Sequence, residues 1–396
     1  MPARALNAAN GPGLPPRLTV KFADKDPATK ALATYHKQGL FMARQESWAE
    51  VGSLLRGLDS SRDHATNGKS TAISFAKGAR RDAVSAAIMA VGRQDEDAAI
   101  RALDPLDLIF EELCEDHGIA FIVAMAHIET AEAWHGAFDH RDTPPANPSA
   151  FKGHMTRART ILDRFDPIAC NAPTLAMAGC RLLRSLGNPS ACTADVFEDL
   201  IDLDPSSPMH LRHFGRALMP RWFGDHDQLD AEARRMAMLT RDVWGAGGYT
   251  WMYLDPLSCD PQSLDRIDAD LFIEGLHDIL DQCPDHSIRN LFAVLTGVTL
   301  DNAQDDDRKR QQIAQCFNWI VQDHLREICP VIWADAPGAP RHQSETDRIK
   351  FGQSRATQVL ARHFSDSLSA GQFVSLTDNG LVIGSPPATW FNSRPV

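Results

Sequence analysis

Hydrophobic residues recur at intervals of three and four along most of the chain. One such series consists of Trp48, Val51, Leu54, Leu55 and Leu58, and similar series run through 272–280 and 313–321. This spacing places apolar side chains on one face of an α-helix. The pattern continues from about residue 27 to 365, so we predict that this part of the chain is almost entirely helical.

Capping residues predict where several helices begin. Asp104 precedes Pro105 and Ser207 precedes Pro208, and both pairs are typical of a helix N-terminus. The acidic cluster at 305–307 suits a helix N-terminus as well, because negative charge there is stabilised by the helix dipole.

The two ends of the chain show a different pattern. Apolar and polar residues alternate over 18–22, which predicts one short strand. Near the C-terminus, two β-prone runs flank Asp378-Asn379-Gly380, a sequence that favours a tight hairpin turn. We therefore expect an all-α protein with a short C-terminal β-hairpin, with which the early strand can pair.

Composition and loops divide the chain into four segments. Residues 1–26 begin with a stretch rich in proline, glycine and alanine, and we expect them to form a flexible N-terminal arm. A loop with three prolines at 140–150 predicts a boundary between an N-terminal helical subdomain, 27–139, and a helical repeat region, 151–365. Residues 366–396 form the predicted hairpin and tail.

Two segments of the repeat region are similar to each other. "APTLAMAGCRLL" at 172–183 and "SPMHLRHFGRAL" at 207–218 share a proline, an arginine and the final leucine at an offset of 35 residues. This offset is close to the tetratricopeptide period of about 34 residues. Leu211, Phe214 and Gly215 resemble the first-helix signature of that repeat. We therefore expect antiparallel helix pairs that stack as an irregular α-solenoid.

A Pro220-Arg221-Trp222 loop follows the second copy, with Phe223 at the position where relatives commonly have glycine. The central half of the chain resembles degenerate tetratricopeptide-like proteins, and more closely an uncharacterised bacterial family built around such a Pro-Arg-Trp loop. The resemblance implies a helical repeat fold and no reaction, because that family has no assigned activity.

Charge and composition argue against several kinds of partner. The chain has 40 basic and 52 acidic residues and a formal net charge of −12, which opposes attraction to nucleic acid or to an anionic membrane surface. The longest apolar run, 118–128, is too short to cross a bilayer, and the N-terminus lacks a secretory signal pattern. We expect a cytoplasmic protein whose eight scattered cysteines are buried, reduced thiols.

The segment "DHATNGKSTAI" at 63–73 contains the closing half of a phosphate-binding loop. The full motif has a glycine five residues before Gly68 and follows a buried strand, whereas this chain has Asp63 there and a predicted helix before it. Asn67-Gly68 instead predicts a turn, and the next helix directs Ile73 and Phe75 inward. We therefore expect no nucleotide or other cofactor.

A possible metal site lies in the segment from His127 to His140. Glu132 and His135 are three residues apart and share one helix face, as in the half-sites of di-iron helical bundles. The chain lacks the second Glu-x-x-His pair that such a site needs. The structural alternative makes His127 a hydrogen-bonded core residue and His135 a helix C-terminal residue favoured by the dipole.

Aromatic residues and arginines gather between residues 212 and 253. Both types are enriched at interface hot spots, although large aromatic rings between short helices also anchor the protein core. We expect Trp222 to lie in the core and Arg221 to be exposed, because a guanidinium is costly to bury without a carboxylate. The candidate binding residues are Arg212, Arg216, Arg221, Trp222, Tyr249 and Trp251.

Stacked helix pairs commonly bind an extended peptide or a helix of another protein. The sequence therefore favours a non-enzymatic protein-interaction or scaffold module, and it indicates no catalytic residue. Two alternatives stay open: a helical metalloenzyme that uses the His127–His140 segment, and a small-ligand sensor with a pocket among the aromatic residues. The identity of the partner and the oligomeric state do not follow from the sequence.

Overall fold

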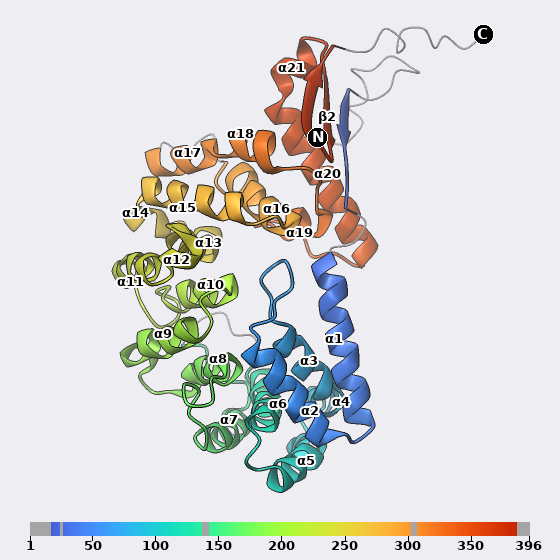
Figure 1. The fold of residues 1–396 in the computed structure, drawn as a ribbon, viewed down its shortest axis with the longest axis vertical. Helices are drawn as coiled ribbons and strands as arrows, with labels where there is room; N and C mark the ends of the chain where they lie inside the picture. Colours follow the sequence, from blue (N-terminus) through green and yellow to red (C-terminus); the bar gives the residue numbers. More distant parts are fainter. Residues whose placement is uncertain (1–16, 24–26, 137–141, 302–306, 386–396) are drawn as a thin grey trace, which may run out of the picture. The chain divides into compact units, whose positions relative to one another are not determined.

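The computed structural model describes residues 17–23, 27–136, 142–301 and 307–385. Most of these residues are helical, and one small sheet contains three strands (Figure 1). The predicted fold class is therefore confirmed as all-α with a short C-terminal β-hairpin. Most of the predicted N-terminal arm and the last residues of the tail lie outside the described residues.

The chain forms two compact units. Residues 27–256 make up the helical unit, and residues 1–26 join 257–396 in the terminal unit. The division falls at Pro256, and the proline-containing loop in which we predicted a subdomain boundary lies within the helical unit.

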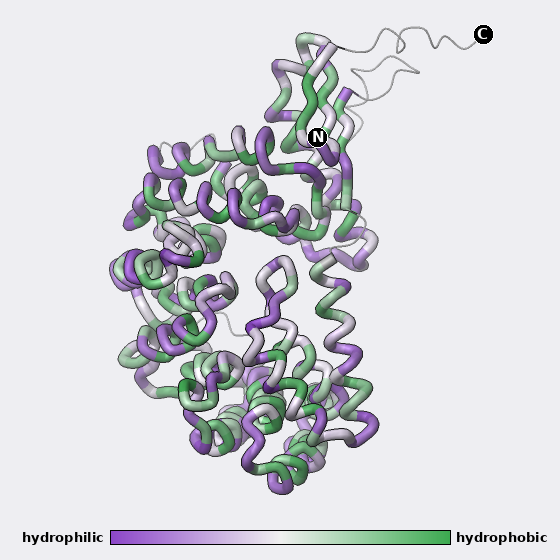
Figure 2. The backbone as a smooth tube through the Cα atoms, in the orientation of Figure 1, coloured by the Kyte–Doolittle hydropathy of each residue, from purple (hydrophilic) through white to green (hydrophobic). Residues whose placement is uncertain are grey.

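The helical unit consists of short helices that pack against their neighbours in sequence, such as α4 with α5, α6 with α7 and α8 with α9. Figure 2 shows hydrophobic and hydrophilic residues alternating along the turns of these helices, as the sequence pattern predicts. The elements are α1 (Pro27–Arg44), α2 (Trp48–Ser60), α3 (Thr71–Ala79), α4 (Arg81–Gly92), α5 (Glu96–Glu112), α6 (His117–His135), α7 (Pro148–Leu162), α8 (Pro173–Leu182), η3 (Leu183–Ser185), η4 (Pro189–Ala191), α9 (Thr193–Leu203), α10 (Pro208–Ala217), α11 (His226–Leu239), α12 (Arg241–Trp244) and α13 (Gly247–Cys259), which crosses the division.

Helix α6 forms the centre of the core of the helical unit. It packs against α2, α4, α5, α7 and α8, and every residue from Gly118 to Ile128 is buried. The apolar run at 118–128 is therefore a core helix. Among the helices that the structure describes, none is long and apolar enough to cross a membrane.

The predicted helix start at Asp104-Pro105 is wrong. Helix α5 begins earlier, at Glu96, where the Asp95 side chain accepts a hydrogen bond from the backbone N–H of Ala98, and Pro105 lies inside the helix. Proline removes one backbone hydrogen bond, but the buried apolar series Ala99, Leu103, Leu106 and Phe110 continues across it. Burial of this face outweighs the lost bond. The starts predicted at Pro208 and after Asp307 are confirmed.

The two similar segments form helices of equal length, α8 and α10, each of 10 residues and each with proline in its first turn. Gly215 in α10 lies against α13, because a Cβ atom at this position would be 1.9 Å from the carbonyl oxygen of Met252. The glycine is thus required for close approach of these two helices.

The terminal unit combines helices with the sheet. Its helical elements are α14 (Ser263–Arg266), α15 (Ala269–Gln282), α16 (His286–Val294), the π-helix η5 (Leu295–Thr299), α17 (Arg308–Gln315), α18 (Phe317–Trp319), the π-helix η6 (Ile320–His324), α19 (Pro330–Ala334), α20 (Glu345–His363) and α21 (Ser365–Ser369). The apolar series at 313–321 is buried as predicted, but it spans a break after Gln315 and a widened turn from Ile320.

The predicted hairpin and its pairing with the early strand are confirmed. β2 (Phe373–Thr377) runs antiparallel to β3 (Gly380–Gly384), and β1 (Leu18–Val20) pairs in parallel with β2. Gly380 has a φ of 108°, a conformation that glycine adopts readily. All eight cysteines are free thiols, but Cys316 and Cys329 alone are buried, so the expectation of buried thiols is wrong for the others.

Candidate functional site

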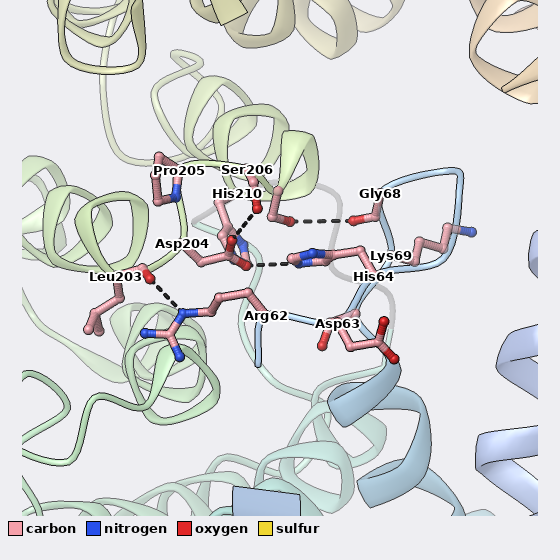
Figure 3. Close-up of polar contacts among 12 residues, drawn as sticks. Arg62, Asp63, His64, Gly68, Lys69, Leu203, Asp204, Pro205, Ser206 and His210 are labelled. Atoms are coloured by element: carbon pink, nitrogen blue, oxygen red, sulfur yellow. Dashed lines mark hydrogen bonds and ion pairs between the residues drawn. The ribbon is translucent and has the colours of Figure 1, made fainter. Parts of the chain in front are cut away.

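A loop at 61–70, between α2 and α3, contacts the turn between α9 and α10 (Figure 3). Arg62 donates from Nε to the carbonyl oxygen of Leu203 at 2.8 Å. The hydroxyl of Ser207 donates to the carbonyl oxygen of Gly68 at 3.5 Å. Gly68 has a φ of 77°, and a side chain there would meet the ring of Pro208. The loop therefore joins two parts of the helical unit that are far apart in sequence.

The local structure supports the predicted turn rather than a phosphate-binding loop. Helix α2, and no strand, precedes the loop, and Gly68 donates its backbone N–H to Ala65 at 2.8 Å. The side chain of Lys69 points away from the contacts in Figure 3. Ser70 caps α3 by accepting from the N–H of Ile73, and Thr71 donates to Asp63. Asp63, Ser70 and Thr71 thus form hydrogen bonds within this segment.

Asp204 brings two histidines together beneath this loop. Its Oδ2 atom accepts hydrogen bonds from Nε2 of His64 at 2.9 Å and from Nε2 of His210 at 3.3 Å. Ser206 donates to the other oxygen at 2.8 Å. Burial raises the pKa of Asp204, but the hydrogen bonds from His210 and His64 outweigh it and hold that pKa well below its ordinary value. Nδ1 of His210 is buried and has no hydrogen-bond partner among the residues described.

A second buried carboxylate, Asp59, lies in the same region. It accepts hydrogen bonds from the backbone N–H of Thr174 at 3.3 Å and from its hydroxyl at 2.6 Å. Burial raises the pKa of Asp59 to about 6 despite these hydrogen bonds, and the charge of Asp204 adds to this effect. Asp59 is therefore the carboxyl group in this cluster that changes its protonation near neutral pH.

These residues line a small pocket. Its walls combine apolar side chains with the cluster of charged and polar groups, namely Leu58, Asp59, Arg62, His64, Ser70, Ile73, Pro173, Thr174, Asp204 and His210. Its enclosed space is about 10 Å³, which is room for about one water molecule. The pairing of His64 with Asp204 could not be predicted from the sequence, because no local pattern relates residues this far apart.

The candidate aromatic residues lie in the core of the helical unit. Trp222, Tyr249 and Trp251 are 8%, 0% and 1% exposed. The hydroxyls of Tyr249 and Tyr253 both donate to Asp230, at 2.6 and 3.2 Å. The core interpretation is therefore the one that the structure shows, and these three rings do not form an exposed hot spot.

The candidate metal ligands have other partners. Glu132 accepts hydrogen bonds from Arg181, at 3.0 Å from Nε, and from Nη1 of Arg184 at 2.8 Å. His135 is buried at the end of α6, and its ring packs edge-on against Phe151. Within the described residues, no group of three or more His, Cys, Asp or Glu side chains is arranged to hold a metal ion. His140, the end of the candidate metal segment, lies outside the described residues.

His127 is a core histidine, as the structural alternative expects. It is 5% exposed, and its Nδ1 lies 3.0 Å from Nδ1 of His154. Its Nε2 donates to Asp107 at 3.1 Å. Burial and the neighbouring His127 lower the pKa of His154 to about 4. The pair is therefore held by hydrogen bonds within the core.

Arginine–carboxylate contacts connect successive helices of the helical unit. Arg80, at the end of α3, donates to Glu129 of α6 at 2.6 Å. Arg212 of α10 forms two hydrogen bonds with Asp255 of α13, at 3.2 and 2.8 Å. Glu132 of α6 binds the guanidinium groups of Arg181, in α8, and of Arg184, in η3. We refer to Arg181, Arg184, Arg212 and Arg216 as the arginine cluster.

The guanidinium groups of the arginine cluster differ in their partners. Arg216 is exposed and has no ion pair or hydrogen bond within the described part of the chain. Burial lowers the pKa of Arg184; Glu132 opposes this effect, and the charges of Arg181 and Arg216 lower the pKa further. Of the other predicted binding residues, Arg221 is exposed as expected.

The comparisons with known proteins identify no relative. No family model, curated protein or solved structure matches this chain. The resemblance to tetratricopeptide-like proteins therefore stays a prediction, and functional inference rests on the geometry.

Proposed function

We propose that this chain is a helical-repeat protein that binds another protein through the surface formed by the arginine cluster. The observation that carries the proposal is the charge balance around Glu132. One carboxylate, Glu132, binds two guanidinium groups, those of Arg181 and Arg184, in a chain with a formal net charge of −12. A positive patch on an acidic protein attracts and orients a partner of opposite charge.

The chemistry of the cluster supports a protein partner. Guanidinium groups match carboxylates through paired hydrogen bonds, and arginine is enriched at protein interfaces. The cluster lies on helices rather than on loops, so its geometry is fixed by packing. The proposal includes the tetratricopeptide-like repeat organisation and the cytoplasmic location expected from the sequence.

The two alternative functions have less support. The metalloenzyme alternative needs Glu132 as a ligand, and this carboxylate is engaged by Arg181 and Arg184. The sensor alternative needs a cavity among aromatic rings that pack closely, and the pocket under the 61–70 loop has room for about one water molecule.

A display library of random peptides tests the proposed function on the purified full-length protein. We expect recovered peptides to bind the wild type and Arg101→Glu, and to lose binding to Arg216→Glu. Arg101 is a matched control, because it is exposed on α5 and has no ion pair in the described part of the chain. Failure to recover any specific peptide would refute the proposed function, and equal binding by both variants would place the interface elsewhere.

A further inference from the structure

Strand β3 lies at one edge of the sheet in the terminal unit. The strand order is β1-β2-β3, so within the described residues β3 pairs with β2 on one side and with no strand on the other. On the β1 side of β2, the N–H of Val374 donates to the carbonyl oxygen of Arg17 at 2.7 Å. On the same side, the carbonyl oxygen of Leu376 accepts from the N–H of Lys21 at 3.3 Å.

The register of the hairpin decides which backbone groups of β3 face the open edge. Facing residues of antiparallel strands alternate between pairs that bond to each other and pairs that direct their backbone groups outward. Val374 faces Ile383, and Leu376 faces Leu381. Since Val374 and Leu376 bond toward β1, Ile383 and Leu381 direct their N–H and C=O groups to the open edge. Neither residue forms a backbone hydrogen bond outside the hairpin in the part of the chain that the structure describes.

The open edge carries apolar side chains and no charge. The strand reads Gly-Leu-Val-Ile-Gly, and Val382 and Ile383 are 42% and 40% exposed. The π-helix η6 contacts β3, and Arg326, which follows η6, lies against the buried Gly380 at the beginning of the strand. Natural edge strands are commonly protected by lysine, proline or a bulge. The regular register and composition of β3 include none of these, which favours pairing with another strand.

The sequence of β3 is complementary to a second copy of itself. Three apolar residues lie between two glycines, so the strand has the same pattern in both directions. Antiparallel pairing about a twofold axis at Val382 places Leu381 opposite Ile383 of the second copy. These are the residues whose backbone groups face the open edge, so each such pair can form two hydrogen bonds. A twofold interface requires this kind of self-complementarity.

We propose that β3 pairs antiparallel with β3 of a second copy of this chain, centred on Val382, to form one continuous sheet with three strands from each copy. A second copy supplies the matching pattern in a register that uses the open backbone groups. The other edge strand, β1, is flanked by Arg17 and Lys21, and such charges oppose pairing between identical strands. The inference goes beyond the proposed function, because β3 belongs to the terminal unit and the arginine cluster to the helical unit.

The short strand and the charge of the chain determine how the dimer responds to conditions. A small interface gives a weak dimer that depends on protein concentration. Each copy has a formal net charge of −12, which opposes association, whereas β3 has no charged residue. Added salt should therefore strengthen self-association by screening the repulsion. Binding of an oppositely charged partner to the arginine cluster should instead weaken with salt.

Sedimentation velocity of the full-length protein from about 1 µM to about 1 mM tests this inference, because weak complexes form in this range. We expect the wild type to shift from monomer to dimer and Val382→Lys to stay monomeric, since two lysines would face each other across the axis. Thr19→Lys is the matched control. Thr19 is exposed and faces Ser375, which faces Val382, so it lies in the same row at the opposite edge of the sheet. Equal thermal midpoints would show that Val382→Lys is folded.

Cysteine substitution tests the register independently. In the proposed pairing, Val382 faces its counterpart in a non-hydrogen-bonded pair, with Cβ atoms about 4.5 Å apart, which a disulfide can span. Oxidation of Val382→Cys should therefore give a covalent dimer. The wild type and Thr19→Cys, treated in the same way, measure the background from the eight native thiols.

Each outcome decides between the second copy and its alternatives. A wild type that stays monomeric at every concentration overturns the inference, and so does a dimer that forms equally in Val382→Lys. The absence of a cross-link in Val382→Cys overturns the pairing centred on this residue. Displayed peptides that bind a monomeric wild type and lose binding to Val382→Lys would make the occupant of the edge a strand of another protein. The proposed function is tested separately, because Arg216→Glu leaves β3 unchanged.

Discussion

His64 donates a hydrogen bond to Asp204 across a sequence separation of 140 residues. The same oxygen of Asp204 also accepts from His210, so one buried carboxylate holds the 61–70 loop to the start of α10. Arg62 reinforces the contact through the carbonyl oxygen of Leu203. Because α10 carries Arg212 and Arg216, this loop helps to position the arginine cluster.

Replacement of Asp204 by alanine should therefore destabilise the helical unit strongly. The substitution leaves the imidazoles of His64 and His210, the second of them buried, without their acceptor, and an unsatisfied buried donor costs about 1–3 kcal/mol. Denaturant unfolding of the full chain measures the change. Asp335→Ala is the control, because Asp335 forms an ion pair with Arg348 at a half-exposed site, and such pairs contribute about 0–1 kcal/mol. Equal losses of unfolding free energy in the two variants would contradict the role of Asp204 in joining the 61–70 loop to the start of α10.

Local signals in the sequence predict the local structure well. The helix α2 before the loop, the turn at Gly68 and the hairpin at Gly380 follow from apolar spacing and from residues that tolerate positive φ. The predicted start of α5 was wrong, because burial of a continuous apolar face overrides the preference of proline for the first turn of a helix.

Contacts between distant segments explain what the sequence could not predict. Nothing near His64 indicates that Asp204 is its partner, because hydrophobic spacing carries no information about which helices meet. The sequence spacing of Glu132 is that of a metal ligand, but in the folded chain Arg181 and Arg184 bind this carboxylate. The repeated arginine at positions 181 and 216 was visible in the sequence, but the binding of Arg181 to Glu132 became apparent only in three dimensions.

Asp59 should make the stability of the helical unit depend on pH. Burial raises its pKa from 3.8 to about 6, so the folded state favours the protonated form. The resulting stabilisation is fully present below the unfolded pKa of 3.8 and is lost as the pH rises through about 6. Between about pH 5 and about pH 8, the free energy of unfolding of the wild type should fall by on the order of 1–2 kcal/mol relative to that of Asp59→Asn.

Unfolding free energies of the wild type and of Asp59→Asn at both pH values test this prediction. Asparagine is a suitable replacement, because its side-chain oxygen can still accept from Thr174 and it does not titrate. If the unfolding free energies of the two proteins changed in parallel with pH, Asp59 would have an ordinary pKa in the folded state.

Trp222 and Arg221 are adjacent but should respond differently to substitution. Trp222 is 8% exposed, and truncation of a buried large aromatic side chain to alanine costs on the order of 3–5 kcal/mol. Arg221 is exposed, and substitutions at such surface positions usually change stability by less than about 0.5 kcal/mol. Thermal and denaturant unfolding of Trp222→Ala and Arg221→Ala measure the two changes in stability. An unchanged midpoint for Trp222→Ala would contradict its place in the core.

Two glycine-to-alanine substitutions should change stability in opposite directions. At Gly215 the added methyl group would lie 1.9 Å from the carbonyl oxygen of Met252, so α10 and α13 must move apart. Such overpacking costs about 1–3 kcal/mol. At Gly57, in α2, no atom lies within 4 Å of the added methyl group, and alanine is favoured in a helix by about 0.5–1 kcal/mol.

Denaturant unfolding of Gly215→Ala and Gly57→Ala compares the two sites directly. Both substitutions change backbone propensity in the same way, so the difference between them isolates the packing of α10 against α13. Equal stabilisation of both variants would show that α10 and α13 do not approach as closely as the structure indicates.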